Sequence, residues 1–251
     1  MRIAIICAGP CDRKFLHEFR NKRKPDYCIA ADRGLLTCLD AGLMPDCVLG
    51  DYDSLIQDAS EGADGEESSV LSQINEYHAN LLEKLGKEGK RILTYPARKD
   101  FSDSEAAVRE AVRIIEDEWQ KEKFLRETDV HDEIYLLGAT GGRLDHFLAN
   151  LAVLMIPTKL GIRAWILDER NEITLLREGC ILPRNRTFGK YVSLIPYTDE
   201  VTGVVLKGFR YLLHGHTLTR DNTLGLSNEI EDEIAEISFD SGILIMILSM
   251  D

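Results

Sequence analysis

Short apolar segments alternate with helical patterns through residues 1–171, and this alternation limits the possible fold more than any other feature. Continuous apolar runs are typical of strands that are covered on both faces of a sheet. Strands separated by helices form parallel sheets through right-handed crossovers. The sequence therefore predicts an α/β domain with a mostly parallel, Rossmann-like sheet and helices on both faces. The predicted strands are Arg2–Cys7, Tyr27–Ala31, Asp46–Leu49, Glu133–Leu137 and Arg163–Leu167.

Three segments between these strands have helical patterns. Gly34–Asp40 is followed by Gly42, which suits the left-handed residue that often ends a helix. Longer helices are expected at about 103–119 and 143–155, each with apolar residues three or four positions apart. The stripes expected to face the core are Val108, Val112, Ile115 and Trp119 on the first, and Leu144, Leu148, Leu151 and Met155 on the second.

The pattern changes after about Asn171. The predicted strands Tyr191–Ile195, Val201–Leu206 and Ile243–Leu248 have no helical pattern between them and are separated by Gly, Pro and Asn. Such spacing is typical of a small antiparallel sandwich. We therefore expect an α/β nucleotide-binding domain at 1–171 and a smaller all-β sandwich at 172–251. The acidic stretch Gln57–Ser72 is interpreted as a solvated loop.

The net charge of −13, from 43 acidic and 30 basic residues, argues against a nucleic-acid partner. No apolar stretch approaches the roughly 18–20 residues that cross a bilayer. The apolar run Ile3–Ala8 is too short for a signal peptide. The six cysteines include no C-x-x-C pair, which favours reduced thiols. We therefore expect a cytoplasmic protein without a membrane partner.

Acidic residues follow two of the predicted strands. Asp32 follows Tyr27–Ala31, and Asp51 and Asp53 follow Asp46–Leu49 in the turn Gly50-Asp51-Tyr52-Asp53-Ser54. Ligands of open parallel sheets bind beyond the carboxyl ends of strands, so these side chains should converge. Two carboxylates two residues apart can share Mg²⁺, although Asp and Ser also simply suit turns.

A second motif is Lys99-Asp100-Phe101-Ser102-Asp103-Ser104-Glu105. Ser102 and Glu105 have the spacing of a capping box, which makes Ser102 the N-cap of the following helix. Asp103 then lies in the first turn, where the helix dipole favours a carboxylate without any ligand. Lys99 and Asp100 precede the cap and have no such structural explanation.

A third motif, Gly138 to His146, follows a predicted strand and opens a helix, which is the context of an anion site. It lacks the lysine of a Walker A loop and the spacing of the dinucleotide fingerprint. Arg143 offers two parallel hydrogen bonds to phosphate, and Asp145 could approach the same metal. His146 and Asn150 share a helix face with Arg143, either as ligand contacts or as a solvated polar face.

Convergence of Asp32, Asp51, Asp53, Asp103 and Asp145 would be strongly repulsive without a cation, which implies a divalent metal. A metal, an arginine and a glycine turn together favour phosphoryl or pyrophosphoryl transfer. These residues do not identify the acceptor.

Taken together, the motifs resemble those of the thiamine pyrophosphokinase family, whose members transfer a diphosphate from ATP to thiamine. The resemblance extends over nearly the whole chain and includes a fold of an α/β nucleotide domain plus a β-sandwich. Its motifs are AADRG (30–34), PDCVLGDYDSL (45–55), KDFSDSE (99–105), GATGGRLDH (138–146) with Asn150, YVSLIP (191–196), VTGVVLKGFRYLL (201–213) and LGLSNE (224–229).

This resemblance implies roles for individual residues. Asp51, Asp53 and Asp103 would hold Mg²⁺, with Asp32, Asp100 and Asp145 nearby, and Lys99 and Arg143 would contact the ATP phosphates. His146, inside the same motif as Arg143, is a further candidate for ligand binding. Ser227 and Asn228 would hydrogen-bond the aminopyrimidine of thiamine, and Tyr211 would stack on it. Without the family match, Ser227 and Asn228 would be interpreted as a loop turn. The resemblance also implies a homodimer with thiamine bound between subunits.

The expected reaction is attack of thiamine's hydroxyl on the β-phosphorus of ATP, releasing AMP, with Asp51 or Asp145 as proton acceptor. One alternative is the same transfer to another hydroxymethyl heterocycle such as a pterin. A non-catalytic nucleotide or thiamine sensor would bind ligand without releasing AMP. A metal-dependent phosphohydrolase would form product without any acceptor.

Overall fold

The predicted alternation of strands and helices is present in the computed structural model, which describes residues 1–51, 79–96, 98–121 and 132–251. The first of its two compact units is Met1–Ile156. The elements of this unit are β1 (Arg2–Ile6), α1 (Arg13–Arg23), β2 (Tyr27–Ala31), α2 (Gly34–Asp40), β3 (Cys47–Gly50), β4 (Arg91–Thr94), α5 (Asp103–Lys121), β5 (Glu133–Leu137), α6 (Leu144–Val153) and α7 (Met155–Thr158), which continues past its end.

The strands of this unit form a parallel sheet in the order β5-β1-β2-β3-β4. The four predicted segments that correspond to β1, β2, β3 and β5 are confirmed as strands. Strand β4 was not predicted, because it is short and only partly buried. All carboxyl ends of a parallel sheet lie along one edge, so the loops after these strands share that edge.

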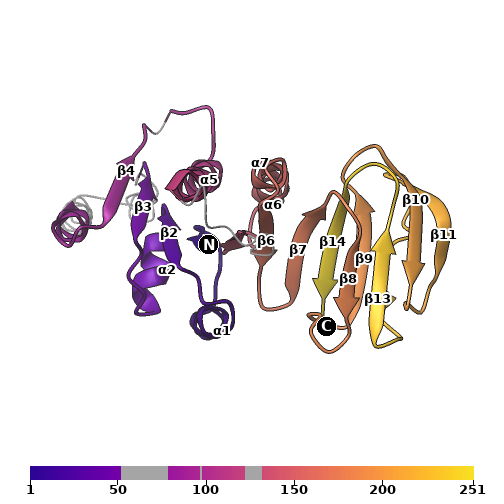
Figure 1. Ribbon diagram of the computed structural model, residues 1–251. Helices are drawn as coiled ribbons and strands as arrows, with labels where there is room; N and C mark the ends of the chain where they lie inside the picture. The colour runs from indigo at the N-terminus through magenta and orange to yellow at the C-terminus, as the bar shows by residue number, and fades with distance from the viewer. Residues whose placement is uncertain (52–78, 97, 122–131) are drawn as a thin grey trace, which may run out of the picture. The chain divides into compact units, whose positions relative to one another are not determined.

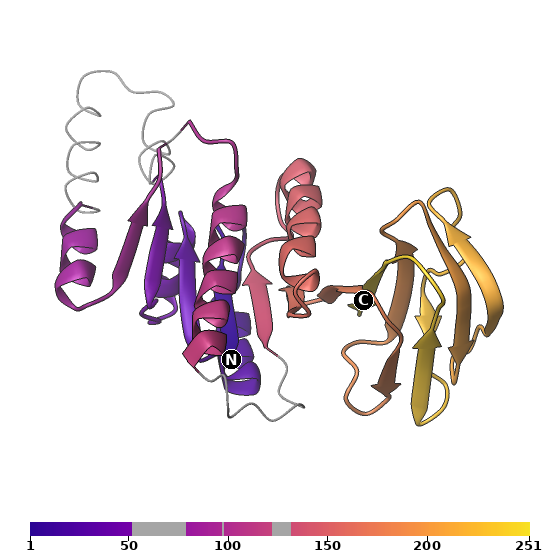
Figure 2. The ribbon, with the colours of Figure 1, turned by 45° about the horizontal axis from the view of Figure 1, so that its top comes forward.

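Helices cover both faces of the sheet, as predicted (Figure 1). Helix α5 lies on one face and buries Val108, Val112 and Ile115 of its predicted stripe, with Trp119 partly buried. Figure 2 shows its length against the strands. Helices α1 and α2 lie on the other face. Helix α2 is followed by Gly42 at φ 65°, as predicted. Helix α1 was not predicted, although the Asp12 carboxylate caps it by accepting from Lys14 N and Phe15 N.

The predicted packing of α6 is wrong. The apolar stripe was expected to face the core, but the Leu144 side chain is 75% exposed and Leu148 is 62% exposed. The residues of α6 that are buried are Asn150 and Val153. The other two residues of the predicted stripe, Leu151 and Met155, are partly buried. Helical spacing identified the helix correctly, but the first half of the apolar stripe does not pack in this unit.

The second compact unit, Pro157–Asp251, consists of antiparallel strands. They are β6 (Arg163–Leu167), β7 (Asn171–Leu176), β8 (Cys180–Pro183), β9 (Tyr191–Pro196), β10 (Glu200–Lys207), β11 (Leu213–Thr219), β12 (Asn228–Glu229), β13 (Ile234–Ser238) and β14 (Leu244–Ser249).

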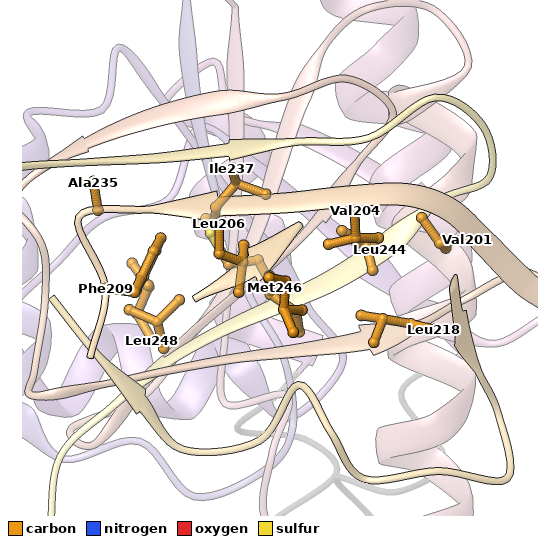
Figure 3. Close-up of a cluster of buried hydrophobic side chains, with 13 residues drawn as sticks. Val201, Val204, Leu206, Phe209, Leu218, Ala235, Ile237, Leu244, Met246 and Leu248 are labelled. Carbon is orange, nitrogen blue, oxygen red and sulfur yellow. The ribbon is translucent and has the colours of Figure 1, made fainter. Parts of the chain in front are cut away.

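These strands form the predicted sandwich. One layer has the order β12-β9-β14-β7-β6, and the other has the order β11-β10-β13-β8. Their facing side chains form one buried cluster, which includes Val204, Leu218, Ile237 and Met246 (Figure 3). Strand β6 pairs antiparallel with β7. The functional boundary at 171/172 stays a prediction.

Several smaller predictions concern the whole chain. All six cysteines are thiols rather than disulfides. Within the described ranges, no helix is long and apolar enough to cross a membrane. The acidic stretch Gln57–Ser72 lies outside the described residues.

Candidate active site

The carboxyl ends of β2 and β3 place Asp32 and Asp51 on neighbouring strands. Asp32 N donates to Leu49 O at 2.7 Å, and Asp32 has a left-handed φ of 51°. The backbone of Gly50 lies so close that an added Cβ would be 3.2 Å from the Asp32 Cα. This close approach explains a glycine just before Asp51. Asp32 is buried, and Asp51 is only slightly exposed.

Lys99 joins Asp51 to Asp103. Its Nζ donates to Asp51 Oδ2 at 3.0 Å and to Asp103 Oδ1 at 2.8 Å. The side chain is only 6% exposed, which is unusual for lysine. Burial acts to lower the pKa of Lys99, but the hydrogen bonds to Asp103 and Asp51 outweigh it and raise the pKa above its usual value. Lys99 is therefore a charged ammonium between two carboxylates.

The start of α5 fixes Asp103 in this position. Ser102 caps the helix, since its Oγ accepts from Glu105 N at 3.1 Å, as predicted. The Glu105 carboxylate does not complete the expected capping box and instead accepts from Arg109 Nε at 2.9 Å. The cap and the helix dipole thus hold the Asp103 carboxylate in the first turn, where it also contacts Lys99.

The glycine turn after β5 presents a second pair of opposite charges. Gly138 has φ 67°, and its carbonyl accepts from Gly9 N at 3.0 Å. Arg143 donates to Asp145 from Nε at 3.2 Å and from Nη2 at 2.5 Å, and both side chains are exposed. Hydrogen bonds from Arg143 lower the pKa of Asp145.

Asn150 does not belong to a solvated polar face. It is buried, and its Nδ2 donates to Ala139 O at 3.0 Å. Its amide therefore ties the glycine turn to the second turn of α6, a structural role that neither sequence alternative included.

In the second unit, Asn228 holds the backbone of Tyr211 from both sides. Its Nδ2 donates to Tyr211 O at 2.7 Å, and its Oδ1 accepts from Tyr211 N at 3.0 Å. Asn228 is 5% exposed, whereas Tyr211 is 62% exposed. Ser227 adopts a left-handed φ of 54°, and its N donates to Ser193 Oγ at 2.9 Å.

The other predicted residues are placed as follows. Asp100 and His146 are exposed, and Asp53 lies outside the described residues. Within the described part of the chain, no three His, Cys, Asp or Glu side chains converge closely enough to hold a metal. A pocket of about 240 Å³ lies between α1 and the amino ends of β2 and β3, and none of the predicted site residues lines it.

Two residues beside these groups were missed by the sequence analysis. The ring of Tyr95 lies with its centroid 6.0 Å from Lys99 Nζ, and Ser193 supports Ser227. Tyr95 follows a short strand and Ser193 lies inside a predicted strand, so neither belongs to a pattern that indicates function. The available signal for Tyr95 was its place four positions before Lys99, a lysine that the sequence had already singled out.

Comparisons with known proteins agree with this two-part arrangement. The family model described as thiamin pyrophosphokinase, catalytic domain, matches residues 20–166, and that described as thiamin pyrophosphokinase, vitamin B1 binding domain, matches residues 179–244. Thiamine pyrophosphokinase of Bacillus subtilis is 30% identical over 223 residues, which cover 89% of this chain and 87% of the relative.

Solved structures show the same fold. The crystal structure of thiamine pyrophosphokinase from Bacillus subtilis has a TM-score of 0.71 with 26% identity, and the match covers 100% of both chains. Thiamin pyrophosphokinase from Candida albicans has a TM-score of 0.69, covering 100% of this chain and 89% of that one, at 13% identity. From the two family models and the Bacillus subtilis relative, it follows that this chain belongs to the thiamine pyrophosphokinase family.

Proposed function

We propose that this chain transfers a diphosphate from ATP to the hydroxyl of thiamine, giving thiamine diphosphate and AMP. The observation that carries the proposal is the buried contact of Lys99 with Asp51 and Asp103 at the carboxyl edge of the sheet. It combines cationic and anionic groups where α/β folds bind nucleotides. The match of residues 179–244 to a vitamin B1 binding domain favours thiamine over a pterin as the acceptor.

Mg²⁺ suits the donors of this site. Asp51 and Asp103 supply hard carboxylate oxygens on either side of an ammonium, so the space between them already accommodates positive charge. Asp51, Asp53 and Asp103 are the proposed ligands, with Asp32 and Asp100 nearby. When bound, Mg²⁺ supplies charge that neutralises the transferring diphosphate.

Lys99 and Arg143 are proposed to bind the phosphates of ATP. Arg143 is exposed and presents a planar group that can bind phosphate oxygens through two hydrogen bonds. His146 follows in the first turn of the helix and is also proposed at the phosphates. The lowered pKa of Asp145 makes its carboxylate a weak proton acceptor, which argues for Asp145 as an orienting partner of Arg143.

Tyr211, Ser227 and Asn228 are proposed to form the thiamine site. The exposed ring of Tyr211 can stack on the aminopyrimidine, and Ser227 can offer its hydroxyl to it. The amide of Asn228 is already used by the backbone of Tyr211, which supports a role in holding that ring in place.

We also propose a cytoplasmic homodimer with thiamine bound between subunits. The exposed leucines Leu144 and Leu148 support it, because adjacent apolar side chains on a surface are typical of interfaces. The change of both to glutamine should shift the mass measured by light scattering from dimer to monomer. A monomeric wild-type protein would contradict the proposal.

The reaction is tested by AMP formation from ATP and Mg²⁺ with and without thiamine. AMP that forms only with thiamine, in an amount equal to thiamine diphosphate, supports the proposal. AMP or phosphate without an acceptor indicates a hydrolase, and binding without product indicates a sensor. Asp51→Asn and Asp103→Asn should each reduce turnover by about 100-fold or more with the fold intact.

A further inference from the structure

Lys99 occupies an unusual environment for a lysine that is expected to bind a nucleotide. Its side chain is nearly inaccessible to solvent, and its ammonium makes hydrogen bonds to two carboxylates at 3.0 and 2.8 Å. The Tyr95 ring lies beside the ammonium, and Phe101 packs against that ring edge to face at 5.4 Å. Lys99 is therefore held away from solvent by side chains of the protein itself.

The two carboxylates need this positive charge. Asp51 and Asp103 both lie within hydrogen-bond distance of the same nitrogen atom, so they lie close to each other. Carboxylates at this separation repel strongly in a partly buried site unless a cation lies between them. The position of the Lys99 ammonium is thus one that a divalent cation would also favour.

The proposed function gives these residues two further tasks. Asp51 and Asp103 are proposed metal ligands, and Lys99 is a proposed phosphate ligand. A carboxylate oxygen that binds a metal directly loses much of its attraction for a neighbouring ammonium, because two cations repel each other. The contacts seen in this structure therefore compete with the contacts expected in the loaded site.

We infer that Lys99 acts as an internal counter-cation of Asp51 and Asp103, and that a divalent cation displaces it onto the nucleotide phosphates. This inference rests on the proposed function and deepens it. Lys99 is thus both a phosphate ligand and a competitor of the metal. The metal releases Lys99 from the two carboxylates, and the phosphates hold Lys99 away from them. Binding of the metal and binding of the nucleotide should therefore strengthen each other.

The inference predicts opposite effects of one substitution. Lys99→Met removes the competing charge, so a divalent cation alone should bind more tightly. The same change removes a phosphate contact, so the nucleotide should bind more weakly. A lysine that only binds phosphate would leave metal affinity unchanged. A lysine that only supports the fold would weaken both.

Mn²⁺ binding without nucleotide, measured by electron paramagnetic resonance, tests the first effect. Lys99→Met should bind Mn²⁺ about tenfold more tightly than wild type, and Lys99→Arg should change the affinity by less than about threefold. Lys90→Met is the matched control, since Lys90 Nζ contacts Asp46 Oδ1 at 3.1 Å near the amino end of β3. Equal or weaker Mn²⁺ binding by Lys99→Met overturns the inference, as does the absence of Mn²⁺ binding in all proteins.

A second measurement uses the wild-type protein, so it does not depend on the folding of a variant. Acetylation of Lys99 by N-hydroxysuccinimidyl acetate is followed by mass spectrometry, with Lys90 as internal control. Lys99 should react slowly alone, faster with Mg²⁺, and slowly again with Mg²⁺ and a non-hydrolysable ATP analogue. No change with Mg²⁺ overturns the inference. Thiamine-dependent AMP formation is measured separately from Mn²⁺ binding and Lys99 acetylation. A failure of the proposed function can therefore be distinguished from a failure of this inference.

Discussion

The side-chain amide of Asn228 gives a prediction about stability that depends on one donor atom, Nδ2. Its Nδ2 donates to Tyr211 O at 2.7 Å, while Oδ1 accepts from Tyr211 N at 3.0 Å and from Glu229 N at 2.9 Å. Asn228→Asp preserves the shape and both accepting contacts but replaces the donor with an oxygen. At neutral pH a carboxylate oxygen would then face a carbonyl oxygen.

The expected loss depends on pH in a defined direction. A protonated carboxyl can still donate to Tyr211 O, so the folded state raises the pKa of the new aspartate above its ordinary value of about 3.9. A raised folded-state pKa gives stability that is present below the unfolded pKa and is lost as the pH rises. The free energy of unfolding that Asn228→Asp loses relative to wild type should grow by about 1.4 kcal/mol for each pH unit between the unfolded-state and the folded-state pKa of the new aspartate. Asn228→Ala should instead lose about 2–3 kcal/mol at every pH, at about 1 kcal/mol for each of its three hydrogen bonds.

Urea unfolding at about pH 4.5 and about pH 7.5 measures the difference. The fluorescence of Trp165 in the second unit is the probe, in a Trp119→Phe background. Asn222→Asp is the matched control, because Asn222 is exposed and its Nδ2 donates to the side chain of the nearby Thr219 at Oγ1. A deficit of Asn228→Asp that is the same at both pH values, or absent, would refute the reasoning.

Three further predictions concern packing and burial. Gly138→Ala should lower the free energy of unfolding by about 1–3 kcal/mol, since φ is 67° and an added Cβ would lie 2.8 Å from the Cys7 carbonyl oxygen; an unchanged thermal unfolding curve would contradict this. Burial raises the pKa of Cys7 and Cys47 from 9.0 to about 12. The contribution of these two thiols to stability should therefore be constant below about pH 9 and be lost as the pH rises further, and a flat urea-unfolding profile between about pH 9 and pH 11 would show the opposite. Leu218→Ala should cost about 2–5 kcal/mol in urea unfolding, because Leu218 is fully buried in the sandwich; a loss below about 1 kcal/mol would be inconsistent with that packing.

Most of the first unit could be predicted because buried parallel strands leave a local signal. Segments such as Ile3–Ile6 and Ile134–Leu137 are apolar without interruption, since helices cover both faces of the sheet. The partly buried edge strand β4 and the strongly charged helix α1 lack such a signal. In the second unit, β11 includes exposed His214 and His216, so its sequence does not resemble a buried strand.

The candidate site could be predicted to the level of residue types at strand ends, but not to the level of contacts. The position of Asp32 and Asp51 directly after predicted parallel strands was enough to place both on one edge. The position of Lys99 between Asp51 and Asp103 depends on how the loop after β4 folds, which is a tertiary property. The use of the Asn228 amide by the Tyr211 backbone likewise joins residues 17 positions apart. Spacing within a motif contains no information on either contact.

Helix α6 shows how a correct periodicity can lead to an incorrect packing prediction. Leu144 and Leu148 are four residues apart, so they lie on one helix face, but that face is exposed. The buried face instead includes the polar Asn150, whose amide fixes the glycine turn through Ala139 O. A hydrophobic stripe predicts that a helix face will be buried, but it does not identify the surface against which that face packs. The exposed stripe begins directly after Arg143, so whatever covers it would also restrict access to the proposed phosphate site. For this reason the oligomeric state and the activity should be measured on the same Leu144→Gln/Leu148→Gln variant.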